Sequence, residues 1–201
     1  DGKAEFGAIQ LPEGYYYVKE LDAGEKHDLN TTMYGFHFHT TDNEKIKHID
    51  LNDSKVINNK LHENELSFKK INEVATLVSG KGYSYAITGN AAGAIFELLD
   101  ADKKVIQTIT VGKDSIGSIK HLPVGTFYLR ESKPSATNLV LSKETLKLVS
   151  TKDGVTVFDS KDKQIGETKA DTKKPTIAFE LTNELIKDTG ELTKTDVSTG
   201  K

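Results

Sequence analysis

Three polar residues in this sequence have side chains that could react with one another: Lys70, Glu131 and Asn183. Each lies in a short segment that alternates apolar and other residues, and each shares the parity of its apolar neighbours. Because alternate residues of a β-strand point to the same face, the pattern predicts an amine, a carboxyl and a carboxamide inside one hydrophobic core. Buried polar groups are costly when unpaired, so we expect the three groups to contact one another.

Burial of these groups predicts a specific reaction. An apolar interior disfavours the charged forms of lysine and glutamate side chains. A neutral Lys70 amine is a nucleophile, and a protonated Glu131 can donate a hydrogen bond to the Asn183 carbonyl and polarise it. Attack on that carbonyl carbon would expel ammonia and leave an amide crosslink between Lys70 and Asn183, with Glu131 as the proton shuttle. Contact between well-oriented groups corresponds to effective molarities of about 10⁵ M or more.

The glutamate belongs to a pattern that occurs twice. The segments "LPEGYYYVKE" at 11–20 and "LPVGTFYLRE" at 122–131 both place Leu-Pro-x-Gly before an aromatic-rich segment that ends in glutamate. Glu20 therefore corresponds to Glu131, and we expect it to have the same catalytic role in a second unit.

The lysine and the asparagine also have counterparts. The segment 56–72 resembles 180–196, and one common interval relates two pairs of positions: Asn59 with Asn183, and Lys70 with Lys194. Asn58 stands beside Asn59, but Asn59 has the parity of the apolar residues that precede it. We therefore expect Asn59 to be the crosslinking residue of its unit.

The order of these positions divides the chain into units. Residues 1–59 would be the C-terminal part of one repeat, residues 60–187 a complete repeat, and residues 188–201 the first strand of a following repeat. Asn59 and Lys194 would each have their reaction partner outside the sequence. The sequence thus predicts a segment of a tandem array, in which stability is built repeat by repeat.

Strand signals dominate the elements that must position these residues. Nine short segments alternate or are rich in β-branched and aromatic residues, and turn-forming clusters separate them. The segment 60–77 has partial helical periodicity but also alternates. The pattern predicts an all-β protein of the sandwich type. The nine segments are 14–21, 33–40, 64–71, 93–100, 104–111, 125–132, 138–150, 154–160 and 176–183.

Four of these motifs together resemble a known family. "GAIFELLD" at 93–100, "LPVGTFYLRE", "LSFKKIN" and "FELTNE" look like the B-type repeats of Gram-positive collagen adhesins and pilins, also called Cna B-type or SpaA-like domains. The resemblance covers 60–187 fully and 1–59 partially, and it includes the repeat opening "GELTKTDVSTGK". It implies inverse immunoglobulin-like β-sandwich repeats in tandem, each with a self-formed Lys–Asn isopeptide bond. One difference is that the stretch from Lys70 to Gly93 is long for the family.

The resemblance also implies a function. It indicates a structural stalk segment of a cell-surface protein or pilin, located outside the cell on the wall of a Gram-positive bacterium. The implied partners are neighbouring repeats of the same chain, and further candidates are host extracellular matrix proteins or other pilin subunits. The alternative is an adhesive module that binds a host protein or glycan directly. No turnover enzyme is expected, since motifs such as G-x-S-x-G and H-E-x-x-H are missing from the sequence.

Composition narrows the choice of function further. The net charge is only −3, with 27 basic and 30 acidic residues, so no nucleic acid partner is expected. No segment approaches the length of a transmembrane span, so no membrane insertion is expected either. Cysteine is absent from the 201 residues, which excludes disulfides. A crosslink that closes a long loop would compensate for the thin core that 36% hydrophobic residues predict.

Two histidines are the remaining candidates for site chemistry. His37 and His39 share one face of the segment "FHFHT" and could help to bind Zn²⁺. The sequence offers no third ligand at a convincing spacing. We therefore expect a solvated strand face, with no metal site and no cofactor.

Overall fold

The computed structural model describes residues 11–39, 58–170 and 176–188. These residues form twelve β-strands, and the described part of the chain contains no helix, so it has none that could cross a membrane. Contacts divide the chain into two compact units, Asp1–Glu63 and Asn64–Lys201. The all-β class predicted from the sequence is confirmed.

The first unit contains a two-stranded antiparallel sheet. Strand β1 (Gly14–Lys19) pairs with β2 (Met33–Phe38), from Gly14 opposite Phe38 to Lys19 opposite Met33. Burial alternates along β1, and the rings of Tyr16 and Phe36 stack with their centroids 5.5 Å apart. The aromatic residues of one parity therefore form the inner face of this sheet, as alternation predicts.

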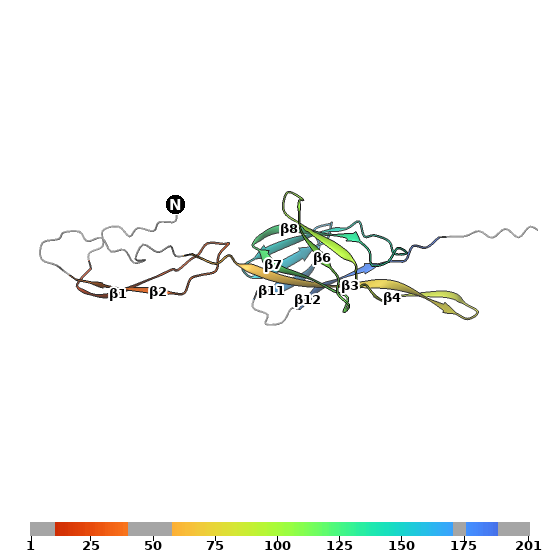
Figure 1. The fold of residues 1–201 in the computed structure, drawn as a ribbon, viewed down its shortest axis with the longest axis horizontal. Helices are drawn as coiled ribbons and strands as arrows, with labels where there is room; N and C mark the ends of the chain where they lie inside the picture. Colours follow the sequence, from red (N-terminus) through yellow and green to blue (C-terminus); the bar gives the residue numbers. More distant parts are fainter. Residues whose placement is uncertain (1–10, 40–57, 171–175, 189–201) are drawn as a thin grey trace, which may run out of the picture. The chain divides into compact units, whose positions relative to one another are not determined.

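The second unit is a sandwich of two sheets, which Figure 1 shows face to face. The larger sheet contains β5 (Ile95–Leu99), β6 (Val105–Thr110), β8 (Gly125–Lys133), β9 (Thr145–Thr151), β10 (Gly154–Phe158) and β11 (Gln164–Lys169). Their order is β11-β10-β9-β8-β5-β6. The smaller sheet contains β3 (Glu63–Val78), β4 (Gly82–Asn90) and β12 (Ile177–Asn183) in the order β12-β3-β4, and β7 (Ile116–Pro123) also pairs with β3.

The hydrophobic core lies between these two sheets. The Phe68 ring, on β3, meets the ring of Phe96 in the opposite sheet in an edge-to-face contact, with the centroids 4.8 Å apart. It also stacks on the Phe179 ring, with the centroids 5.5 Å apart. Gly117 of β7 lies directly against Phe68, where an added Cβ would come within 2.3 Å of the ring. Other core residues come from both sheets: Leu66, Leu98, Ile109, Ile119, Leu122, Leu129, Leu146, Leu148, Val155 and Val157.

The first and last strands of the second unit are parallel neighbours. Strand β12 pairs with the inner half of β3, so that Leu181 lies beside Lys70 and Asn183 beside Asn72. Residues paired across parallel strands point to the same face of the sheet. Lys70 and Asn183 therefore both project into the core.

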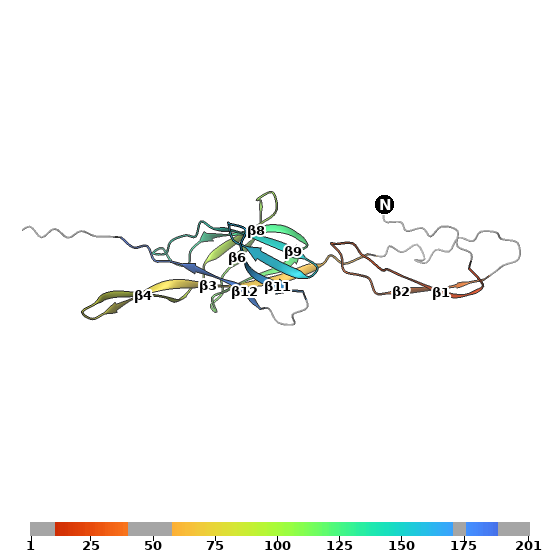
Figure 2. The ribbon, with the colours of Figure 1, turned by 180° about the vertical axis from the view of Figure 1, so that it is seen from behind.

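The outer half of β3 continues into a long hairpin with β4. Figures 1 and 2 show this hairpin projecting beyond the sandwich, and its turn follows the pairing of Val78 with Gly82. Gly80 and Gly82 have positive φ angles of 74° and 83°, which favour glycine. The hairpin accounts for the length of the chain between Lys70 and Gly93. Its exposed apolar side chains are Val74, Leu77, Val78, Tyr83, Tyr85 and Ile87.

The strand predictions are confirmed with corrections. In 138–150 only the part from Thr145 is a strand, and of 60–77 the residues from Glu63 onward lie in β3, with no helix. Strands β4, β7 and β11 were not predicted. The apolar residues of β7 and β11 are few and do not alternate, so the sequence pattern indicated no strand there. In β4, Tyr83, Tyr85 and Ile87 do alternate, and this pattern was overlooked.

Candidate crosslink site

Three strands bring the candidate residues together. Lys70 lies in the middle of β3, Asn183 is the last residue of β12, and Glu131 lies on β8 in the opposite sheet. All three are buried, with at most 4% of any residue exposed. The two sheets thus face each other across a polar contact that is enclosed by the core.

The contacts among the three side chains form a closed set. The Lys70 Nζ donates to the Asn183 Oδ1 at 2.5 Å, and the Asn183 Nδ2 donates to the Glu131 Oε1 at 2.8 Å. The distance from the Lys70 Nζ to the same Glu131 oxygen is 3.5 Å. The amine also donates to the backbone carbonyl of Thr182 at 3.1 Å. Each polar group therefore has a partner, as its burial requires.

The surroundings of Lys70 favour the neutral amine. Burial among apolar groups is the largest influence and lowers the pKa of Lys70, although the nearby Glu131 carboxyl acts in the opposite direction. The Phe96 ring forms part of this apolar wall, with its centroid 5.6 Å from the Nζ. The neutral amine is the form of a lysine side chain that can act as a nucleophile, and a lowered pKa increases its population.

Glu131 is oriented by a contact outside the three residues. Its Oε2 accepts a hydrogen bond from the backbone N–H of Ser142 at 2.9 Å, which leaves Oε1 directed at Lys70 and Asn183. This donor could not be predicted from the sequence. A backbone group carries no side-chain signal, so only the fold reveals it.

One expectation about Glu131 needs correction. The sequence led us to expect a hydrogen bond from Glu131 to the carbonyl oxygen of Asn183. In the structure the Lys70 Nζ donates to that oxygen, and Glu131 accepts a hydrogen bond from the amide nitrogen of Asn183 instead. The carboxyl is therefore placed beside the atom that would leave as ammonia.

The first unit repeats the contact between glutamate and asparagine in a part-buried position, and no lysine of its described residues contacts the pair. The Asn59 Nδ2 donates to the Glu20 Oε1 at 2.6 Å, and the backbone N–H of Asn30 donates to Oε2 at 2.8 Å. The hydrogen bond from Asn59, followed by that from Asn30, lowers the pKa of Glu20. The structure thus places Asn59 against the expected glutamate. Lys194 lies outside the described residues.

The fold and this site define a class: an all-β sandwich whose first and last strands carry a buried lysine and asparagine beside a glutamate of the opposite sheet. Residues 87–164 match the family model SpaA, a prealbumin-like fold domain. The resemblance to SpaA-like domains is therefore confirmed. The matched range contains Glu131, whereas Lys70 and Asn183 lie on either side of it.

A comparison with solved structures gives matches at low sequence identity. The Bacillus anthracis TIE protein has a TM-score of 0.52 at 15% identity, covering 88% of this chain and 26% of its own. GBS52, the minor pilin of Streptococcus agalactiae, has a TM-score of 0.38 at 17% identity, covering 92% of this chain and 66% of its own. The pilus 2b backbone protein of group B streptococcus has a TM-score of 0.38 at 18% identity, covering 92% of this chain and 54% of its own.

This chain thus spans about a quarter of the length of the TIE protein. A comparison with curated proteins found no match. The likeness to the TIE protein supports the fold, and the chemistry rests on the contacts described above.

Proposed function

We propose that the second unit forms an intramolecular isopeptide bond between Lys70 and Asn183, and that the chain is a structural stalk segment of a Gram-positive surface protein. One observation carries the proposal. A lysine amine, an asparagine amide and a glutamate carboxyl contact one another, and the side chains of Lys70 and Glu131 are fully buried. No single one of the three residues would support this chemistry by itself.

The reaction starts with proton transfer. The Lys70 ammonium gives one proton to the Glu131 carboxylate, 3.5 Å away, and becomes a neutral amine. The Nζ then attacks the Asn183 Cγ, and the C–Nδ2 bond breaks as the new C–Nζ bond is made. A second proton passes from the Nζ through Glu131 to the leaving Nδ2, so that ammonia departs. One hydrogen remains on the new amide, and Glu131 ends as the neutral acid.

The crosslink removes an electrostatic cost from the core. A buried ion pair gains little net stability, because desolvation of both charges offsets their attraction. After the reaction Lys70 is part of a neutral amide and Glu131 is a neutral acid that can hydrogen-bond to it. The product is therefore better suited to this apolar site than the reactants are.

The bond also constrains the chain. It joins residues 113 positions apart, and a closed loop of about 100 residues is worth about 4.7 kcal/mol by the chain-entropy relation for disulfides. The sequence has no cysteine with which to obtain this effect otherwise. A stalk exposed to shear and proteases outside the cell would benefit from such a constraint.

The proposed location and partners follow from this role. The chain would stand on the outer face of the cell wall, with neighbouring repeats of the same chain as its direct contacts. The first unit would form its own bond at Asn59, with Glu20 as proton shuttle and a lysine from another segment. Saturable binding of a host matrix protein or glycan by the purified chain would support the adhesive alternative instead.

Intact-mass spectrometry of the purified chain tests the bond. We expect a mass lower than the sequence mass by one ammonia, and a branched peptide containing Lys70 and Asn183 after proteolysis. Asn183→Ala, Lys70→Met and Glu131→Gln should restore the full mass. Lys69→Ala is the matched control, because Lys69 is the neighbouring lysine with a half-exposed side chain, and it should keep the reduced mass. An unreduced mass in folded wild-type protein contradicts the proposal.

A further inference from the structure

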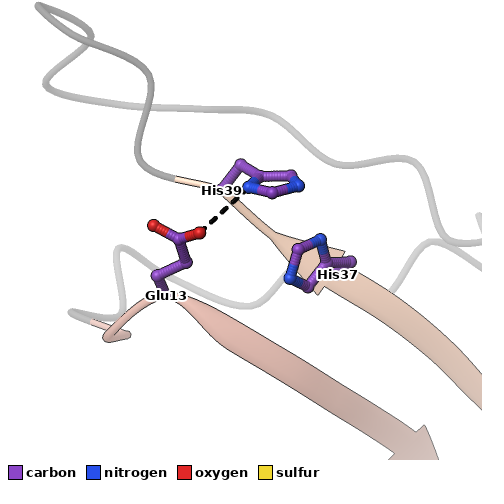
Figure 3. Close-up of side chains that lie close together, drawn as sticks. All are labelled: Glu13, His37 and His39. Atoms are coloured by element: carbon purple, nitrogen blue, oxygen red, sulfur yellow. Dashed lines mark hydrogen bonds and ion pairs between the residues drawn. The ribbon is translucent and has the colours of Figure 1, made fainter.

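A second cluster of reactive side chains lies in the first unit, away from Glu20 and Asn59. Glu13 stands directly before β1, His37 lies near the end of β2, and His39 follows that strand. Each residue offers one ligand atom, and these atoms all lie within 4.8 Å of one another. Figure 3 shows the three side chains gathered at this end of the sheet.

The strand register produces the cluster. His37 and His39 are two residues apart and therefore point to the same side. The pairing of Gly14 with Phe38 continues the register by one residue and places Glu13 beside His39. Glu13 is 26 residues from His39 in the chain, which is why the sequence alone offered no third ligand. The register supplies that ligand from the neighbouring strand.

The contacts hold the three groups close together. The His39 Nδ1 is 3.1 Å from the Glu13 Oε1, and the rings of His37 and His39 meet edge to face with centroids 3.8 Å apart. His37 also stacks on Tyr15, with the ring centroids 4.1 Å apart, which limits the rotation of the imidazole. The side chains of Glu13 and His39 are 52% and 58% exposed, so an ion can reach them from solvent.

We propose that Glu13, His37 and His39 form a binding site for a divalent transition-metal ion of the Zn²⁺ type. Two imidazoles and a carboxylate are donors that Zn²⁺ binds, whereas Mg²⁺ and Ca²⁺ prefer oxygen ligands throughout. Ligand atoms about 2.0–2.2 Å from a tetrahedral metal lie about 3.3–3.6 Å from one another. The 3.1 Å distance between the His39 Nδ1 and the Glu13 Oε1 is already close to that spacing. Rotation of the exposed side chains would bring the other ligand atoms to the same spacing. Solvent would supply the fourth ligand.

The bound ion would connect the start of β1 to the end of β2. It would close the end of this two-stranded sheet opposite to the pairing of Lys19 with Met33. Any ligand that binds only the folded form stabilises it, so the ion would raise the thermal midpoint of the first unit. This function is independent of the crosslink in the second unit.

Isothermal titration of Zn²⁺ into the whole chain, without a histidine tag, tests the site. We expect one ion per chain, and an affinity that falls at least about tenfold in His37→Ala, His39→Ala and Glu13→Gln. His27→Ala is the matched control, because His27 belongs to the same unit but not to the cluster, and it should bind as the wild type does. Co²⁺ should give a visible absorption band that the same three variants lose.

Two results would overturn the metal proposal. One is the lack of saturable Zn²⁺ binding by folded wild-type chain. The other is an unchanged affinity in His39→Ala, which would place any bound ion elsewhere. Circular dichroism of each variant shows whether the sheet is intact. Because the three ligand side chains are exposed or half-buried, we expect the sheet to remain intact in each variant.

Discussion

The Nδ2 of Asn183 lies 2.8 Å from the Oε1 of Glu131, although the two residues belong to different sheets and are 52 positions apart. Asn59 and Glu20 repeat this contact in the first unit at 2.6 Å. In both units the second carboxylate oxygen accepts a backbone N–H from 10 or 11 residues further along the chain. The glutamate of each unit is thus held by an asparagine side chain at one oxygen and by a backbone N–H at the other.

Loss of the crosslink should lower stability by several kcal/mol. Asn183→Ala removes the electrophile and reopens a loop of 113 residues, so we expect its free energy of unfolding to fall by about 4.7 kcal/mol. Denaturant unfolding of the variant and the wild type measures the difference. Equal midpoints for the two proteins would show that the bond does not stabilise the fold.

Without the crosslink, stability should depend on pH through Lys70. Burial lowers the pKa of Lys70 in the folded state, so the folded chain binds fewer protons than the unfolded chain between this pKa and the ordinary one. The stability of Asn183→Ala should therefore rise with pH across that interval. The double variant Lys70→Met/Asn183→Ala lacks this titration and should show a smaller rise. Parallel slopes in denaturant titrations at several pH values would contradict the prediction.

Gly117→Ala should destabilise the second unit by about 1–3 kcal/mol, because the new methyl group would overlap the Phe68 ring. Phe68 is fully buried and its ring contacts those of Phe96 and Phe179, so a shift of the ring would disturb the core. Calorimetric melting measures the loss. Gly14→Ala is the control, because a Cβ there meets its nearest neighbour at an ordinary 3.7 Å.

Glu73 should contribute to acid sensitivity. Its carboxylate accepts hydrogen bonds from the Lys187 Nζ at 2.8 Å and from the backbone N–H of Leu185 at 2.9 Å, and these bonds lower its pKa. As the pH falls, Glu73 therefore becomes protonated at a higher pH in the unfolded chain than in the folded chain. The stability that its contacts contribute is lost progressively as the pH falls below the usual pKa range of a glutamate side chain. Urea midpoints between neutral and acid pH should fall less steeply in Glu73→Gln. An equally steep fall of the urea midpoint with decreasing pH in Glu73→Gln and in the wild type would exclude this role.

The sequence predicted the residues of the candidate crosslink because strand parity encodes which side chains face the core. Lys70, Glu131 and Asn183 each followed that rule. Parity does not encode which strands are neighbours, so the approach of Glu13 to His39 could not be inferred. The donor to Glu131 is a backbone group of Ser142, which has no signature in the sequence. Strand β4 was missed although Tyr83, Tyr85 and Ile87 alternate in its sequence; that these side chains are exposed is visible only in the structure.

The parallel pairing of β3 with β12 has a mechanical consequence. A pull on the start of β3 and the end of β12 in opposite directions would shear the two strands along their lengths, so their hydrogen bonds would have to break together rather than one after another. A bond from Lys70 to Asn183 would shorten the loaded path further. Tension would run along β3 to residue 70 and leave at residue 183, and residues 71–182 would carry none of it.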